Sequence, residues 1–380
     1  MGGLTPAPAP APDDERRDRA LLTRVCEPGD RQVARLVREH GAGGALALLR
    51  AADPAVRTPE RYLARLEAAD VDADLARLAR VDGRVVVPGD LEWPTQLDDL
   101  GELAPLALWV RGAADLRMSA LRSVAVVGAR AATSYGTYVA STLAGDLALS
   151  GWTVVSGGAY GIDAAAHTGA LAGGGVTVAV LACGVDVAYP QRHDALFARV
   201  AADGVLVSEV PPGSAPHRGR FLVRNRVIAA LTRGTLVVEA ALRSGSLSTA
   251  RDAERLGRPV LVVPGPVTSP MSQGVHRELR RGAVPVTCAA EVVEAVGELG
   301  TDLAPEPESP VRPSDRLDPI AARVLDAVPV RRPATADSIA RTAGLTPAET
   351  SAALGLLELE GFVRRGPQGW SLPPRRGAPR

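Results

Sequence analysis

The sequence contains no lysine, so arginine carries nearly all of its positive charge. Its 43 basic residues are matched by 43 acidic residues, which leaves a formal net charge of +0. A neutral chain is not drawn as a whole to a polyanion or to a membrane surface. Any site for a nucleic acid must therefore be a local cluster of arginines.

Aromatic residues and cysteines are also scarce. Aromatics make up only 3% of the chain, so few nucleic-acid bases can be stacked on protein rings. Cys26, Cys183 and Cys288 lie far apart, and no CxxC or HExxH pattern occurs. This spacing argues against a disulfide framework and against a zinc site. We expect three free, partly buried thiols.

Long apolar runs are missing as well. No stretch approaches the length of a membrane span, and residues 1–18 lack the apolar core of a signal peptide. These first residues are rich in proline and alanine and then in charge, which predicts a disordered tail. We therefore expect a soluble, cytoplasmic protein.

What the sequence does contain is a change of pattern along the chain. Residues 19–84 repeat apolar positions every three or four residues, which predicts a small helical domain. Within it, PGD at 28–30 should separate two helices, and HGAGG at 40–44 should end the second. Over residues 85–299, short β-branched strands alternate with helices. Such repeats predict an α/β fold with an extended Rossmann-like, doubly wound and mostly parallel sheet.

The last part of the chain has a different organisation. Residues 300–318 are rich in proline and acidic residues and predict a linker. Residues 319–373 contain three helical stretches, with Gly344 at a turn and Pro347 at a helix start, and then a hairpin around GPQG. This order predicts a C-terminal winged-helix domain, followed by a basic tail at 374–380.

Several loops after the predicted strands suit phosphates. In the first, Arg130 stands where a dinucleotide fold needs glycine, and the acid that would hold a ribose is absent after the second strand. NAD and FAD are therefore disfavoured, no P-loop is present, and we expect no cofactor. Arg130 leads into a helix whose N-terminus favours anions, with Ser134 as the expected N-cap or as a phosphate donor.

The stretch SGGAYGIDAAAH at 156–167 contains a glycine turn and the start of a second helix. Gly157, Gly158 and Gly161 let backbone N–H groups approach an oxyanion closely. Asp163 is better interpreted as structural, because a carboxylate in the first turn offsets the helix dipole. His167 is either a core residue or a site residue, and the sequence leaves both open.

The stretch RFLVRNRVIAAL at 220–231 is expected to begin a helix at Arg224, Asn225 and Arg226. Arginines at a helix start oppose the dipole, and a local rule broken in this way points to function. The alternative is that Arg226 pairs inside the fold with Glu239 or with Asp163.

A second anion cradle follows at residues 243–246, where Arg243 lies beside Ser244, Gly245 and Ser246 ahead of another helix. Ser272 and His276 add polar groups further along the chain. Several separated anion sites along one edge of a sheet suit a run of phosphates better than a single cofactor.

At this point eight motifs, taken in order, resemble those of the DNA-processing protein A family (DprA, also called Smf). They are VAVVGAR, VSGGAYGIDAAAH, CGVDVAYP, LVSEVPPG, RNRVIAAL, VVEAALRSGSLSTARDA, VPGPV and SQGVHRELRRGA. The likeness covers about residues 85–296, and the flanking domains fit the family's layout. It implies single-stranded DNA as a partner, usually a homodimer, protection of strands during natural transformation or recombination, and loading of the RecA recombinase. It implies no catalytic step, so we expect no enzyme.

The resemblance and the loops together predict one DNA site. It comprises Gly128, Arg130, Ser134, Gly157, Gly158, Tyr160, Gly161, His167, Arg224, Asn225, Arg226, Arg243, Ser244, Gly245, Ser246, Ser272 and His276. Family members often have lysine at the position of Tyr160, so this chain replaces a charge with a ring on which a base can stack. His193 and His276 stand where asparagine is common. Phe221 is the other ring expected to stack with a base.

Two alternative functions remain. Nucleotide phosphoribohydrolases of the LOG class share this kind of sheet, but their PGGxGTxxE stretch is absent and Glu239 stands before RSGS instead. A duplex-DNA regulator would work through the winged helix. Its expected recognition helix carries Glu349, Glu358 and Glu360 and no basic residue, which favours a protein-contact role.

Overall fold

The computed structural model describes residues 12–298, 302–305 and 313–373. The chain divides into two compact units, residues 1–305 and residues 306–380. Most of the predicted N-terminal tail, the basic C-terminal tail and much of the predicted linker lie outside the described residues.

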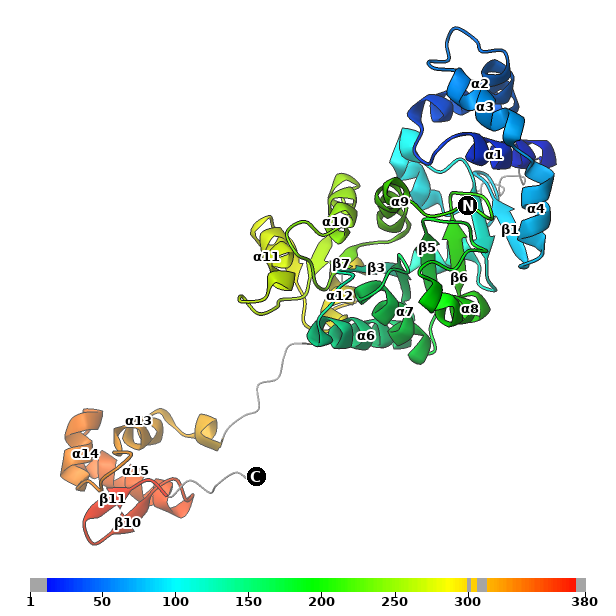
Figure 1. Cartoon of the computed structure of the whole chain (residues 1–380). Helices are drawn as coiled ribbons and strands as arrows, with labels where there is room; N and C mark the ends of the chain where they lie inside the picture. The colour runs from blue at the N-terminus through cyan, green and yellow to red at the C-terminus, as the bar shows by residue number, and fades with distance from the viewer. Residues whose placement is uncertain (1–11, 299–301, 306–312, 374–380) are drawn as a thin grey trace, which may run out of the picture. The chain divides into compact units, whose positions relative to one another are not determined.

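A mixed sheet forms the centre of the first unit (Figure 1). Within the described residues it has nine strands in the order β1-β2-β6-β5-β4-β3-β7-β8-β9. The strands from β6 to β9 run parallel, while β1 and β2 add an antiparallel edge. The mostly parallel α/β sheet predicted from the sequence is therefore confirmed. The strands are β1 Gly83–Val86, β2 Leu108–Arg111, β3 Ser123–Val127, β4 Thr153–Ser156, β5 Thr177–Leu181, β6 Val205–Ser208, β7 Thr235–Val237, β8 Val260–Val262 and β9 Val284–Pro285.

Helices cover both faces of this sheet. Successive side chains of each strand point to opposite faces, so the apolar strands bury side chains against helices on both sides. In β3, Ala125 and Val127 pack in the core that includes residues of α9 and α10. Val124 and Val126 pack in a second core with residues of α6, α7 and α12. The helices of this region are α5 Leu116–Leu121, α6 Ser134–Leu149, α7 Ile162–Ala172, α8 Asp194–Asp203, α9 Arg218–Leu231, α10 Ser246–Arg255, α11 Gln273–Arg280 and α12 Ala289–Val296, with 3₁₀ turns η1 Thr95–Leu103, η2 Gln191–His193 and η3 Pro270–Ser272.

The strand order reverses between β3 and β7. From β3 the chain proceeds outward through β4, β5 and β6, returns through α9, and then continues from β7 to β9 on the other side. In open α/β sheets, ligands bind beyond the carboxyl ends of the strands at such a reversal. The loops after β3 and β7 should therefore border a binding crevice.

The N-terminal helices differ from expectation at two points. They are α1 Asp13–Val25, α2 Arg31–Arg50, α3 Glu60–Ala68 and α4 Val71–Ala79. Helix α1 starts well before residue 19, because three acidic residues fill its first turn, where the dipole favours them. The HGAGG segment does not end α2. It kinks the helix at Gly41 (φ 71°), and the Glu15 carboxylate accepts from the Ala42 N–H at 3.2 Å beyond the kink.

Over its described residues, 313–373, the second unit contains three helices and a hairpin, as predicted for a winged helix. They are α13 Pro319–Ala327, α14 Ala336–Ala343 and α15 Pro347–Leu359, with β10 Arg364–Gly366, β11 Gly369–Ser371 and a short η4 turn Pro313–Arg316. Gly344 ends α14 in the left-handed region (φ 64°). Thr346 and Glu349 form a capping box at α15, with Pro347 at its first turn.

All three cysteines are free thiols; Cys26 and Cys183 are buried, whereas Cys288 is exposed and not partly buried as expected. Burial raises the pKa of the Cys183 thiol to about 11, so it stays protonated at neutral pH. Among the described residues, no helix has both the length and the apolar character that crossing a membrane requires.

Candidate functional site

A pocket of about 750 Å³ opens at the strand reversal, and we call it the arginine pocket. Its walls come from the loop after β3, the start of α7, helix α9 and the loop between β7 and α10. The lining residues are Val127, Gly128, Ala129, Arg130, Ala131, Ala159, Asp163, Tyr189, Pro216, His217, Arg218, Phe221, Leu222, Arg224, Asn225, Ile228, Ala241, Arg243, Ser244, Gly245, Ser246, Thr249 and Met271. The two loops after β3 and β7 thus meet where the topology places a ligand.

Positively charged side chains outnumber carboxylates in the lining of the arginine pocket. Arg130, Arg218, Arg224 and Arg243 line it, and Asp163 is the one carboxylate among its lining residues. None of the four arginines forms an ion pair with a carboxylate of the described residues. A chain of zero net charge therefore concentrates unpaired positive charge at one place, which is the footprint of a polyanion site.

Arg224 is fixed in the floor of the pocket. Its Nη1 donates to the carbonyl of Gly157 at 2.7 Å and to that of Val180. Burial lowers the pKa of Arg224 to about 10, so the side chain still carries its charge at neutral pH. A Cβ at position 157 would lie 2.5 Å from the guanidinium nitrogens, so only glycine leaves room for this contact.

Asp163 lies in the first turn of α7 and accepts a hydrogen bond from the Ala159 N–H at 3.3 Å. Burial raises the pKa of its carboxyl above the ordinary value, and the nearby positive charge of Arg224 opposes that shift. Asp163 thus stabilises the glycine turn and offsets the helix dipole, which agrees with its structural interpretation.

The loop after β3 presents Arg130 to the pocket. Its guanidinium lies over the Phe221 ring, 4.6 Å from the ring centroid, which is cation–π geometry. Gly161, at φ 77°, packs so tightly under this loop that a Cβ would collide with the Ala129 and Arg130 carbonyl oxygens. Gly161 therefore positions the Arg130 loop rather than lining the pocket itself, whereas Ala159 of the same turn does line it.

The loop after β7 forms the opposite wall. The hydroxyls of Ser244 and Ser246 lie 2.8 Å apart at the N-terminus of α10. Asn225 ties helix α9 to this wall, because its amide donates to the Gly245 carbonyl at 3.2 Å and to the Ser248 hydroxyl at 2.7 Å. Free N–H groups at a helix N-terminus next to two hydroxyls and Arg243 make a suitable cradle for a phosphate.

The loop after β3 is tied to β7 by a buried carboxylate. Glu239 accepts from the Thr133 N–H at 2.9 Å and from the Thr133 hydroxyl at 2.6 Å. Thr133, not Ser134, is the N-cap of α6, since its side chain accepts from the Gly136 N–H. Ser134 is exposed and lies outside the pocket lining, which corrects the expected N-cap.

Arg226 has a partner that sequence reasoning did not identify. It forms a two-armed ion pair with Glu209, with both N–O distances 2.7 Å and both side chains buried. The pairing inside the fold considered for Arg226 is therefore present, but with Glu209 rather than Glu239 or Asp163. Arg226 does not line the arginine pocket.

The helix start assumed for the RNR stretch is wrong. Helix α9 begins at Arg218, so Arg224, Asn225 and Arg226 lie near its middle and are not at its dipole end. Arg218 in the first turn was missed, and Tyr189 was missed as well. A correct helix start would have revealed Arg218, because residues 218, 221, 222 and 225 share one face at helical spacing.

Three further predicted residues lie away from the pocket. His167 is fully buried, with Nδ1 2.7 Å from the Thr177 hydroxyl, so it is a core residue. Burial lowers its pKa to about 3, with the charges of His193 and Arg224 acting in the same direction. Ser272 is buried at the end of η3, and the His276 Nε2 lies 3.0 Å from the Gly265 carbonyl oxygen.

In total, Gly128, Arg130, Arg224, Asn225, Arg243, Ser244, Gly245 and Ser246 line the arginine pocket. Gly157 and Gly161 support it from behind, and Gly158 packs against Phe197. Tyr160 lines a separate hollow beside it. The structure thus brings the Arg130 loop and the anion cradle at residues 243–246 together and places the glycine turn of residues 157–161 beneath the Arg130 loop.

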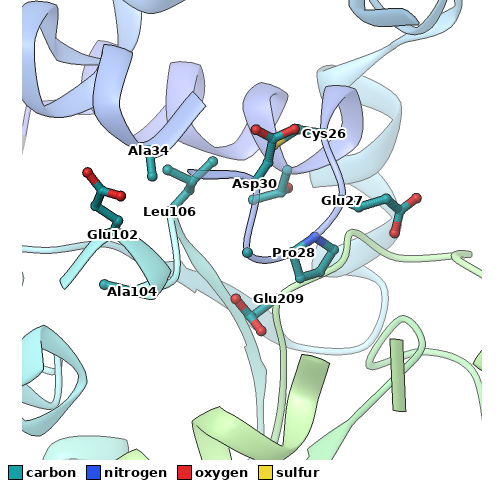
Figure 2. Close-up of a pocket in the computed structure, with 11 residues that line it drawn as sticks. Cys26, Glu27, Pro28, Asp30, Ala34, Glu102, Ala104, Leu106 and Glu209 are labelled. Atoms are coloured by element: carbon teal, nitrogen blue, oxygen red, sulfur yellow. The ribbon is translucent and has the colours of Figure 1, made fainter. Parts of the chain in front are cut away.

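The turn between α1 and α2 holds the back of α9. Glu27 accepts from Arg220 at 2.9 and 3.1 Å, and Gly29 adopts φ 78° where a Cβ would lie 3.3 Å from Val223. Burial raises the pKa of Glu27, but the hydrogen bond and charge of Arg220 outweigh it, so the net shift is downward. Figure 2 shows the cavity of about 20 Å³ between this turn and Glu209. Because it has room for little more than one water, it is a packing gap of the domain junction.

Comparisons with known proteins agree with this architecture. Residues 84–297 match the model of the DNA recombination-mediator protein A family, and residues 307–369 match the DprA winged helix domain. The chain is 46% identical over 361 residues to the putative DNA processing protein DprA of Mycobacterium tuberculosis, covering 92% of both chains. It is 39% identical to protein Smf of Escherichia coli, covering 75% of this chain and 76% of that protein.

Solved structures show the same relationship. The X-ray structure of DprA from Streptococcus pneumoniae superposes with a TM-score of 0.62 at 32% identity, covering 75% of this chain and 97% of that one. DNA processing protein A of Helicobacter pylori, whose structure describes its single-stranded DNA binding mode, gives a TM-score of 0.51 at 30% identity, covering 57% and 96%. With a family model over more than half of its length and a relative at 46% identity, this chain belongs to the DNA-processing protein A (DprA/Smf) family.

Proposed function

We propose that this chain binds single-stranded DNA in the arginine pocket and acts in DNA processing during transformation or recombination. The observation that carries the proposal is the excess of unpaired arginines over carboxylates at the strand reversal. The Helicobacter pylori relative, at 30% identity, binds single-stranded DNA. Membership of the same family supports the same ligand here.

The contacts offered by the pocket are suited to phosphates. Arginine side chains, hydroxyls and the N-terminus of α10 bind the DNA backbone, which carries no sequence information. Binding should therefore tolerate any sequence and weaken steeply as salt rises, because phosphate contacts release counterions. Few rings line the pocket, so stacking contributes at a small number of bases.

We further infer that the protein protects the strand, loads the RecA recombinase onto it and works as a homodimer. Family membership alone supports these three parts of the proposal. For the winged helix we infer a protein partner. The capping Glu349, the exposed Glu358 and the C-cap Glu360 are the charged residues along α15, and no basic residue offsets them, which disfavours contact with a DNA backbone.

We infer binding rather than catalysis for the arginine pocket. A phosphoribohydrolase needs a carboxylate free to act at the glycosidic bond. Both oxygens of Glu239 are occupied by Thr133, and the pocket's own carboxylate, Asp163, is buried beneath the glycine turn. Release of a free base from nucleoside monophosphates would contradict this inference.

The experiment that tests the proposal is fluorescence anisotropy of the full-length protein with a labelled oligo-dT strand and with a labelled duplex of equal length, at two salt concentrations. A variant with Arg364 and Arg365 of the wing changed to serine serves as the comparison, because both side chains are exposed. We expect both proteins to prefer the single strand with the same salt dependence. A preference for duplex that the wing variant loses would identify a winged-helix regulator instead.

A further inference from the structure

A second hollow of about 860 Å³ adjoins the arginine pocket, and its chemistry is different. It is lined by Tyr160, Ala188, Tyr189, Pro190, Gln191 and Asp194. No arginine lines it, and its largest surfaces are two tyrosine rings that are 44% and 45% exposed. Two of the chain's five tyrosines therefore meet at one hollow.

The Tyr160 ring is held in place from behind. The His193 ring meets it edge-on, with centroids 4.8 Å apart, and packs in turn against Phe197 at 5.9 Å. The His193 Nδ1 lies 3.1 Å from the carbonyl oxygen of Gly158, which fixes the imidazole. Because these neighbours immobilise Tyr160 before any ligand arrives, stacking on its open face loses little side-chain entropy.

A row of contacts connects the two hollows. Tyr189 lines both of them. Its ring lies 5.8 Å from Phe221, and Phe221 supports the guanidinium of Arg130 at 4.6 Å. A strand whose phosphate contacts Arg130 therefore has aromatic surface continuing directly from that phosphate toward Tyr160.

We infer that this second hollow is a nucleobase subsite, in which a base of the bound strand stacks on Tyr160 or Tyr189; the inference rests on the proposed function. A phosphate is excluded as the occupant, because the lining has no cation and carries the carboxylate of Asp194. Every base has a face that stacks on an aromatic ring, so the subsite adds affinity without demanding a sequence.

The test compares two labelled strands of equal length with the full-length protein. One is oligo-dT, and the other has the same number of phosphates but abasic sugars. Stacking of one base on one ring strengthens binding by about 5- to 100-fold. Wild-type protein should bind oligo-dT more tightly than the abasic strand, and Tyr160→Ala and Tyr189→Ala should each reduce that ratio. Affinity for the abasic strand should stay the same in Tyr160→Ala, because that residue lies outside the arginine pocket.

Two control variants separate the subsite from other effects. Tyr160→Phe keeps the ring and should keep the ratio. Tyr138→Ala removes a 70% exposed tyrosine of α6 that lines neither hollow, and should change nothing. If both strands bind but neither Tyr160→Ala nor Tyr189→Ala reduces the ratio, the subsite is refuted while the proposed function stands. If neither strand binds, the proposed function is refuted and the subsite with it.

Discussion

Replacing Arg130 with alanine tests the proposed site most directly. The side chain is exposed, lines the pocket and pairs with no carboxylate of the described residues. Its guanidinium lies over the Phe221 ring. The carbonyl of residue 130 still packs on Gly161 after the change, so the loop keeps its position. Folding stability should therefore change by no more than about 0.5 kcal/mol, as is usual for surface substitutions.

The loss of binding can be derived from a single phosphate contact. A charge-assisted hydrogen bond to a phosphate contributes about 1.5–3 kcal/mol, which corresponds to a loss of about 10- to 100-fold in affinity. Removing one phosphate contact from a single strand should also reduce the slope of log K against log salt by about 0.7. Both effects should be equal for all sequences, because the contact is with the backbone.

The assay is fluorescence anisotropy with labelled oligo-dT and a mixed-sequence strand over a salt series. Arg199→Ala is the matched control: it removes the same charge from an exposed position of α8 that lines neither hollow. We expect its affinity and salt slope to equal those of the wild type within about twofold. If Arg130→Ala behaves like Arg199→Ala at low salt, the strand does not bind where the pocket lies.

Three further predictions concern the packing of the sheet domain around the pocket. Gly161→Ala should weaken DNA binding and cost about 1–3 kcal/mol of stability, since it strains φ 77° and pushes on the Arg130 loop; unchanged thermal melting would refute that packing. Glu209→Gln should cost about 3–5 kcal/mol in urea unfolding by leaving buried Arg226 unpaired, and a loss below 1 kcal/mol would contradict the buried pair. Burial lowers the pKa of His167 to about 3, so only the unfolded chain takes up its proton between pH 6.5 and 3. The free energy of unfolding should therefore decrease as the pH is lowered from 6.5 to 3, by up to about 1.4 kcal/mol per pH unit. In urea unfolding, His167→Gln should show a smaller decrease over the same window, and equal slopes in the two proteins would refute this assignment.

The sheet could be predicted from the sequence because its strands are short, apolar and β-branched on both faces. Such runs have few alternatives to a buried parallel strand, and their order places the loops after β3 and β7 beside each other. Arg130 and the Arg243–Ser246 segment follow from that order alone. They line the pocket as a consequence of topology, with no need to know any side-chain conformation.

The boundaries of individual helices were harder to predict, because contacts with distant parts of the chain set them. His217 precedes α9 without a capping side-chain bond, and Gly219 follows in the first turn. Neither residue resembles a helix start, so the start was placed too late and Arg218 was missed. Likewise, HGAGG resembles a helix end. Helix α2 continues past it because Leu46 and Leu49 are buried beyond the kink and Glu15, from another helix, caps the restart.

Helix α9 shows why the sequence alone does not tell which of its arginines face the ligand and which pair inside the fold. Residues 218, 221, 222 and 225 face the arginine pocket, whereas 220, 223 and 226 contact Glu27, Gly29 and Glu209 on the opposite side. Both rows have helical spacing, so periodicity identifies two faces but not which of them meets the ligand. That choice depends on the acidic turn between α1 and α2, which lies nearly two hundred residues earlier in the chain. The turn between α1 and α2 and the loop after β6 therefore take part in the site indirectly. Glu27 pairs with Arg220 and Glu209 pairs with Arg226, and Arg218 on the other side of α9 stays free for phosphate.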